Sequence, residues 1–469
     1  MNAITIRTGL TSIALAAAMV LAACGNKDAG KPAASGASGA APAATKSANA
    51  GSPPADGTTQ FFPLLSYRTG PYAPNGIPWA DGKQDYIKLI NERDGGVNGV
   101  KLSFEECETG YATDRGVECY ERLKTKPGVS VFDPQSTGVT FALTEKAPND
   151  KIPLLTFGYG LSVSQNGDFF KWNFPLSGSY WTAADALIQH LAAKEGGLKG
   201  KKVALVYHDS PFGKEPLPLL QKRAELNGFE LQLLPVTAPG VEQKATWLQV
   251  RQSQPDYVLL WGWGVMNSTA IKEAQATGYP REKMYGVWWA GAEPDVKDVA
   301  AGAKGYNALT LNGSGQEPQV IQEILKHVYG KGNGTASGKD EVGTVLYNRG
   351  VVIQMLAVEA VRTAQEKFGK GKVMTAEQVR WGFENLKLDK DQLAKLGFGD
   401  MVAPINTSCK DHMGSTASRV HTWDGSKWTP SSDWIKADPA VIDPLIKAGS
   451  EKYASEKGLK ARTADDCKG

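Results

Sequence analysis

The chain has 469 residues, 41% of them hydrophobic and 9% aromatic, so it can bury a large core and should form more than one domain. Its 52 basic and 49 acidic residues give a formal net charge of +3 at pH 7. This balance excludes the basic footprint of a nucleic-acid-binding protein and is typical of a mixed, solvated surface.

The N-terminal segment predicts export across a membrane. Arg7 precedes an apolar run over residues 13–22, which is too short to span a bilayer and is typical of a signal peptide. The run ends in Leu-Ala-Ala-Cys at residues 21–24, which resembles the lipobox of bacterial lipoproteins. The resemblance implies a signal peptide over residues 1–23 and a lipid on Cys24, anchoring the protein to the periplasmic face of the inner or outer membrane. The alternative is an ordinary signal peptide followed by an incidental cysteine.

Residues 24–57 follow as a segment of unusual composition. They are almost entirely Ala, Gly, Ser, Pro, Lys and Asn, with no apolar side chain larger than alanine after Cys24. Such a segment cannot bury enough surface to fold, so we expect a disordered, flexible tether.

From residue 58 onwards, strand patterns and helix patterns alternate, as they do in a parallel sheet covered by helices. One series precedes Trp172, and a second series of similar size follows it. The expected strands lie at residues 102–105, 129–132, 153–157, 203–207, 229–234, 257–261 and 284–288. Two such series predict an α/β protein with two lobes rather than one large sheet.

The last third of the chain combines helices with a hairpin. A strand-like run at residues 306–311 precedes the helical patterns, most of which we expect to return to the first lobe. The expected helices lie at residues 319–329, 342–368 and 376–385, the last with Thr375 as its N-cap. Residues 418–428, with Asp424-Gly425 as a tight turn, predict a β-hairpin.

Four of the five cysteines are left to pair if Cys24 carries a lipid, and export makes disulfides favourable. We favour Cys107 with Cys119 across a polar loop, and Cys409 with Cys467 as a clip on the C-terminal tail. The other two connectivities stay open. Metal binding is the rival interpretation, but neither pair has the spacing of a zinc site and the five histidines are scattered, so we expect neither a metal nor a cofactor.

Two motifs carry a family resemblance. Thr-Gly-Pro-Tyr-Ala-Pro-Asn-Gly at residues 69–76 and Asn-Glu-Arg-Asp-Gly-Gly-Val-Asn-Gly-Val-Lys-Leu at 91–102 resemble the leucine/isoleucine/valine-binding receptors of ABC transporters, the type I periplasmic binding proteins. The resemblance continues through the strand and loop at residues 203–213 to the hairpin, and it runs from about residue 61 to 428.

The resemblance implies two Rossmann-like lobes joined by three crossovers, here near Ser177, Gly305 and Thr407. The first lobe would comprise residues 58–177 and 306–406, and the second residues 178–305 and 407–469, including a small hairpin and the C-terminal tail. It also implies a monomeric receptor, not an enzyme, that closes on a small molecule and delivers it to an ABC permease and ATPase complex. Ligands of open α/β sheets bind where loops leave the carboxyl ends of strands, so the cleft is the expected site.

On the first lobe, the resemblance implies that the Ser136 hydroxyl receives a ligand carboxylate. Thr137 begins a helix whose N–H groups could add to anion binding, although Ser136 could equally be a plain N-cap. Tyr159 and Gly160 match a loop that binds through backbone N–H groups. Two further candidates lie at the cleft mouth, each with a structural alternative. These are Asn75, which could be a turn residue, and Arg68, which could form a surface salt bridge.

On the second lobe, the resemblance implies that Phe212 and Trp263 cover the ligand once the lobes close. Trp288 is the main difference from the residue pattern of this family, because its amino-acid binders place an acidic residue at this position to pair with the ammonium group of the ligand. A buried ammonium without a counter-charge costs several kcal/mol. The acidic residues that could replace it are Asp209, Glu293 and Asp295.

The tryptophans suggest an aromatic box made of Trp263, Trp288 and Trp289 with Phe212 and Tyr159. Such a box favours a flat aromatic molecule, an amide or a quaternary amine by stacking or cation–π contact. The alternative is that several of these rings are ordinary core, and at most one of Trp288 and Trp289 should point straight into the cleft.

Two other functions remain open. A ligand sensor feeding a membrane signalling receptor would use the same clamp. A hydrolase is disfavoured, since the sequence lacks a Gly-x-Ser-x-Gly elbow, a His-Glu-x-x-His motif and a convincing Cys-His arrangement.

Overall fold

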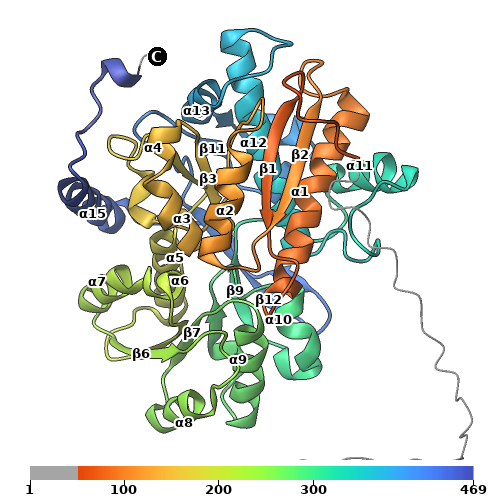
Figure 1. The fold of residues 1–469 in the computed structure, drawn as a ribbon. Helices are drawn as coiled ribbons and strands as arrows, with labels where there is room; N and C mark the ends of the chain where they lie inside the picture. Colours follow the sequence, from red (N-terminus) through yellow and green to blue (C-terminus); the bar gives the residue numbers. More distant parts are fainter. Residues whose placement is uncertain (1–50, 468–469) are drawn as a thin grey trace, which may run out of the picture. The chain divides into compact units, whose positions relative to one another are not determined.

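Strands of the first series pair in parallel, as expected for strands that are buried on both faces. The computed structural model describes residues 51–467, in which β1 (Gln60–Ser66) pairs with β2 (Leu102–Glu108) over seven residues (Figure 1). On its other side, β1 bridges to residues 129–133, which bridge in turn to β3 (Leu154–Phe157), and β3 pairs with β4 (Asn173–Leu176). This sheet is the centre of the first lobe.

A close contact between two helices brings a late part of the chain back to this lobe. α1 (Ala73–Asp94) packs on α12 (Val345–Phe368) with touching backbones. A Cβ on Gly82 would lie 2.0 Å from the carbonyl oxygen of Tyr347, and one on Gly350 would lie 2.2 Å from that of Trp79, so only glycine fits at either position. The other helices of this lobe are α2 (Thr113–Leu123), α3 (Thr137–Thr144), α4 (Ala147–Asp150), α11 (Gln319–His327), α13 (Ala376–Glu384) and α14 (Lys390–Lys395).

The second lobe has a mixed sheet. Its parallel strands are β6 (Glu230–Val236), β5 (Lys202–His208), β7 (Tyr257–Trp261), β8 (Met284–Gly286) and β9 (Asn307–Thr310), in that spatial order. The predicted hairpin adds β12 (Ala417–Trp423) antiparallel to β9 and β13 (Trp428–Pro430) antiparallel to β12, with Trp423 opposite Trp428 across the turn. β14 (Ile435–Lys436) also pairs antiparallel with β12. The helices of this lobe are α5 (Tyr180–Glu195), α6 (Pro211–Lys214), α7 (Leu217–Asn227), α8 (Lys244–Ser253), α9 (Val265–Ala276) and α10 (Glu293–Val296).

The two later crossovers lie further along the chain than expected. The boundary at Gly305 is wrong because β9 still pairs with β8, and the first backbone bridge after β9 joins Asn312 to Val402. The boundary at Thr407 is wrong because His412 still stacks on Phe174 of β4 at 4.3 Å. The chain enters the second sheet only at β12.

The C-terminal tail returns to the first lobe rather than staying on the second. α15 (Pro439–Lys457) begins beside Arg223 of the second lobe, and its Tyr453 packs on Phe170 of the first. Cys467 is bonded to Cys409, and Cys107 to Cys119, which is the pairing that we favoured from the sequence.

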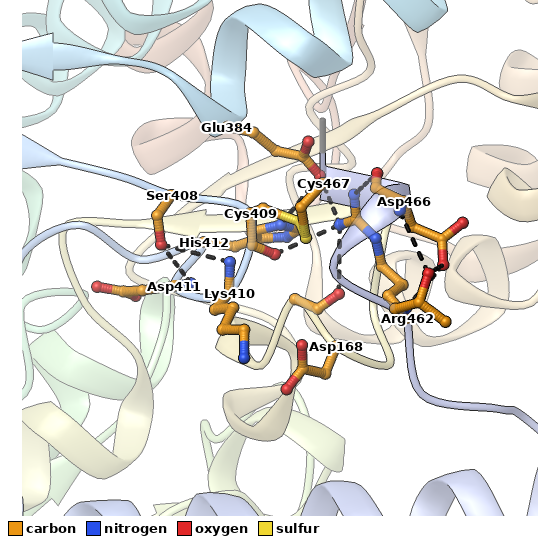
Figure 2. Close-up of a disulfide and its surroundings, with 12 residues drawn as sticks. Asp168, Glu384, Ser408, Cys409, Lys410, Asp411, His412, Arg462, Asp466 and Cys467 are labelled. Atoms are coloured by element: carbon orange, nitrogen blue, oxygen red, sulfur yellow. Dashed lines mark hydrogen bonds and ion pairs between the residues drawn. A yellow bond between two sulfur atoms is a disulfide. The ribbon is translucent and has the colours of Figure 1, made fainter. Parts of the chain in front are cut away.

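Beside the tail disulfide lies a buried carboxylate cluster (Figure 2). Glu384, at the end of α13, pairs with Arg462 of the tail at 2.6 Å and with Arg380 at 2.6 Å, and Nε2 of His412 lies 3.4 Å away. Burial alone raises the pKa of Glu384, but His412, Arg462 and Arg380 outweigh it and hold the pKa at about 2. The ion pairs of this cluster therefore hold the tail on the first lobe in addition to the disulfide between Cys409 and Cys467.

The expected tether is partly ordered at its C-terminal end. The hydroxyl of Ser52 donates to the carbonyl oxygen of Phe104 and accepts from its N–H, both at 2.8 Å, because β2 lies at the sheet edge with free backbone groups. The tether therefore ends before residue 57. The predicted signal peptide, Cys24 and residues 24–50 lie outside the described residues.

Candidate functional site

A narrow cavity lies between the lobes where the strands of both sheets end. Its empty volume, including the space at its open mouth, is about 240 Å³, and hydrogen bonds between the lobes beside it hold them closed. Eight of the eleven lining residues are aromatic, and none is charged. The lining residues are Tyr67, Trp79, Tyr111, Gln135, Ser136, Thr137, Tyr159, Tyr180, Phe212, Trp263 and Trp289.

The loop that leads from residues 129–133 into α3 forms one wall. Ser136 has extended backbone before the first helical turn, yet its side chain makes no capping hydrogen bond. Burial raises the pKa of the Tyr111 hydroxyl, and hydrogen bonding with Ser136 opposes that rise. The Thr137 hydroxyl lies 3.2 Å from that of Tyr180. Ser136 and Thr137 therefore both reach the cavity, and Ser136 is the N-cap residue of α3 without using its side chain as a cap.

Tyr159 enters the cavity with its ring, whereas Gly160 lies behind the wall. The Tyr159 hydroxyl donates to Asp133 and accepts from the N–H of Gln135 at 2.8 Å. Asp133 is itself paired with Lys83 at 2.7 Å, and both side chains are buried. Gly160 faces Thr140 and lines no part of the cavity, so its predicted contact with a ligand is not supported by its position.

Phe212 and Trp263 form the wall of the second lobe. Both are buried, and the ring of Trp263 meets those of Trp289 and Tyr67 edge to face at 5.3 and 6.2 Å. The indole N–H of Trp263 has no hydrogen-bond partner among the described residues. Trp263 thus presents a ring and a free donor to the cavity.

The structure puts Trp289 rather than Trp288 into the cavity. The chain turns after β8, with the Ala290 N–H donating to the Val287 carbonyl, and of the two neighbouring rings only that of Trp289 lines the cavity. Both indole N–H groups donate to the Gly158 carbonyl oxygen of the first lobe, at 2.6 Å from Trp288 and 3.0 Å from Trp289. Trp288 therefore supports lobe contact, and its predicted place in the aromatic box is wrong.

Arg349 of α12, which the sequence did not single out, lies behind the Trp289 ring. Its guanidinium is 4.7 Å from the ring centroid and donates to the Trp288 carbonyl at 2.7 Å and to Asn312 at 2.9 Å. Burial lowers the pKa of Arg349 to about 9. The only signal in the sequence was an arginine inside an apolar helix.

The acidic residues that could have received an ammonium group do not reach the cavity. Asp209 pairs with Lys214 at the surface, and Glu293 accepts from the Val345 N–H at 3.0 Å. Asp295 accepts from Asn267 at 2.9 Å. Burial raises the pKa of Asp295 to about 7, so this carboxyl is poorly suited to hold a cation.

Arg68 and Asn75 are not cavity residues either. Arg68 is held by Asp81 at 2.7 Å and Glu106 at 2.5 Å, the salt-bridge alternative that its sequence context left open. Asn75 points toward Asp295, 3.4 Å away.

Five lining residues were not singled out from the sequence, namely Tyr67, Trp79, Tyr111, Gln135 and Tyr180. Tyr67 directly follows β1, Tyr111 lies shortly after β2, and Gln135 lies shortly after the segment 129–133, so the rule that sites form at strand ends points to all three. Trp79 and Tyr180 lie in helices, where nothing in the pattern separates a site residue from core.

Comparisons with known proteins agree with this geometry. The sequence profile of the periplasmic binding protein family matches residues 59–427. The chain belongs to the periplasmic binding protein family. Its members are two-lobed solute-binding receptors, so this chain is an extracytoplasmic receptor for a small molecule. The predicted family and fold class are thereby confirmed.

Solved structures resemble this periplasmic binding protein over most of its length. A protein of the Pseudomonas fluorescens group, described as an ABC transporter permease, is 42% identical, with the match covering 87% of this chain and 99% of its own and a TM-score of 0.82. A branched-chain amino acid ABC transporter protein from Thermus thermophilus with bound valine is 23% identical over 82% of this chain and 98% of its own, with a TM-score of 0.70. A solute-binding protein from R. palustris in complex with benzoate is 17% identical over 81% and 98%, with a TM-score of 0.64. No curated protein matches the chain. Within residues 51–467, no helix is both long and apolar enough to cross a membrane.

Proposed function

We propose that this receptor serves an ABC importer by capturing a small flat molecule between its lobes and delivering it to a membrane permease. One observation carries the choice of ligand, namely that eight aromatic rings and no charged side chain line the cavity. Flat rings or planar polar groups gain stacking contacts there, at roughly 1 kcal/mol for each good ring.

An ordinary α-amino acid fits this cavity poorly. Its carboxylate could meet Ser136 and Thr137, but its ammonium group would face aromatic rings without a carboxylate partner. Asp295 is engaged elsewhere, and Arg349 adds positive charge behind Trp289. An uncompensated buried ammonium costs several kcal/mol, which outweighs the gain from one or two ring contacts.

The solved relatives support import as the role. The protein from the Pseudomonas fluorescens group and the Thermus thermophilus protein are both described as parts of ABC transporters, and the R. palustris protein binds the flat acid benzoate. We propose further that the receptor is a monomer, that a lipid on Cys24 anchors it at the periplasmic face of a membrane, and that it performs no catalysis.

A thermal-shift screen tests the proposal. The purified protein is heated with flat aromatic acids, aromatic and short amides, quaternary amines and α-amino acids, since a tight ligand raises the melting temperature by mass action. We expect flat molecules without an ammonium group to give the largest shifts. A set of hits confined to α-amino acids would refute the proposed ligand class.

Trp263→Ala should weaken binding of every hit at least tenfold, about 1.4 kcal/mol, because the ring covers the cavity from the second lobe. Trp381→Ala is the matched control. Trp381 is half-buried on α13, packs on Phe368 and lines no part of this cavity. Titration calorimetry should give an unchanged affinity for the control, and an unchanged affinity for Trp263→Ala would remove that ring from the site.

A further inference from the structure

Gln135 is a buried amide whose hydrogen-bonding atoms are both unused. Only 3% of the residue is exposed, it lines the cavity, and neither Oε1 nor Nε2 has a hydrogen-bond partner among the described residues. A buried amide left without partners costs about 1–3 kcal/mol. A side chain in this state needs a partner that enters the cavity.

The backbone of Gln135 is held in place without any help from its side chain. Its φ of 58° lies in the left-handed region, which costs a residue with a Cβ about 1 kcal/mol. Its N–H donates to the Tyr159 hydroxyl at 2.8 Å and lies 3.3 Å from Asp133, which Lys83 holds by an ion pair. A buried polar network thus fixes the strained residue, and strain of this kind is typical of functional sites.

Other unused polar atoms around the cavity are mostly donors. The hydroxyl of Tyr67 and the indole N–H groups of Trp79 and Trp263 lack partners among residues 51–467. Indole N–H groups can only donate, whereas Oε1 of Gln135 can only accept. A ligand that satisfies this set has acceptor oxygens and at least one N–H or O–H group beside them.

We propose that Gln135 determines specificity by pairing with an amide-type group, a carbonyl next to an N–H, on the ligand. Nε2 of Gln135 donates to the ligand carbonyl, and Oε1 accepts from the ligand N–H. Carboxamides, ureas and the lactam edges of flat heterocycles carry such a group. This inference rests on the proposed function, because it names the ligand class of the same cavity.

Ligands that carry a carboxylate or a ketone in place of the amide-type group test this assignment. A carboxylate offers two acceptors but no donor, so it leaves Oε1 of Gln135 unpaired, and a ketone does the same without the charge. Sites built to hydrogen-bond a ligand N–H reject an analogue that lacks it, because the protein atom is then left buried and unpaired.

The test uses benzamide, benzoate and acetophenone, which share a flat ring and differ in the polar group. Titration calorimetry on the full-length wild-type protein should show benzamide binding at least tenfold more tightly than either of the others. Gln135→Leu should remove this preference by weakening benzamide alone. Tighter binding of benzoate than of benzamide, or a preference that survives in Gln135→Leu, would overturn the assignment.

Gln135→Asn controls for a folding defect in Gln135→Leu, because asparagine adopts a left-handed backbone readily. Its shorter side chain places the amide group out of reach of the ligand. It should keep the melting temperature of the unliganded protein and lose most of the benzamide preference; a full preference in this variant would count against the assignment. Trp263→Ala should weaken all three molecules together. If none of the three binds the wild-type protein, the proposed function fails; if they bind without preference, only the role of Gln135 fails.

Discussion

Replacing Glu384 by glutamine should destabilise the protein at neutral pH. The side chain is 3% exposed and contacts Arg380, Arg462 and His412. Its pKa falls from the ordinary 4.5 to about 2, which corresponds to roughly 3 kcal/mol of stabilisation at about 1.4 kcal/mol per pKa unit. Glutamine keeps the shape but loses the charge, so both arginines lose their shared counter-charge.

The pH dependence follows from the direction of this shift. A carboxyl with a depressed folded-state pKa contributes its full stabilisation above pH 4.5 and loses it as the pH falls toward 2. The free energy of unfolding should therefore differ between wild type and Glu384→Gln by about 3 kcal/mol at pH 7 and by only about 1 kcal/mol at pH 3.

Urea unfolding followed by tryptophan fluorescence measures both differences. The matched control is Glu377→Gln, because the Glu377 side chain is 55% exposed and lies 3.6 Å from that of Lys151, which is 62% exposed. Exposed pairs of this kind contribute about 0–1 kcal/mol, so the control should change little. A Glu384→Gln effect that is equal at both pH values would show that shape rather than charge holds the tail.

Two further predictions concern the tail and the lobe contact. Replacing Cys409 and Cys467 together by serine should lower the free energy of unfolding by about 4 kcal/mol in the chain-entropy model for a loop of 58 residues, and an unfolding curve that matches wild type would contradict this. Glu215 of the second lobe accepts from the Ser162 N–H of the first at 3.1 Å, and burial raises the pKa of Glu215 to about 7. Closure should therefore favour the protonated carboxyl, and ligand affinity measured by calorimetry should fall by at least about tenfold as the pH rises from 5 to 8. A Glu215→Gln variant with the same pH profile as wild type would exclude this residue as the cause.

Much of the fold could be predicted because local signals and burial agree. The strand expected at residues 203–207 is the centre of β5 (Lys202–His208), where an apolar run is buried on both faces. Thr375 caps α13 and accepts from the Gln378 N–H, as its position before the helix predicts. The Asp424-Gly425 turn joins β12 to β13 for the same reason, since its residues suit only a tight turn.

The failures share a physical cause, which is that local patterns do not encode long-range partners. Residues 306–311 have a strand pattern, but only contact with β8 decides which sheet they join. Trp288 and Trp289 are equivalent in sequence, and the turn after β8 decides which ring enters the cavity. Arg349 lies against the Trp289 ring, and this contact joins elements that are far apart in the sequence. The signals that succeeded in the site were those tied to strand ends.

A single backbone oxygen atom, that of Gly158, affects how the two lobes separate. The carbonyl oxygen of Gly158 has two lone pairs, and the neighbouring indoles of Trp288 and Trp289 use both. Because the two rings are carried by the same short turn, pulling the lobes apart breaks both bonds together and leaves three polar groups to be rehydrated at once. This contact between the lobes therefore forms or breaks as a unit. The lobes should open in one step, and the bound molecule should leave in that step.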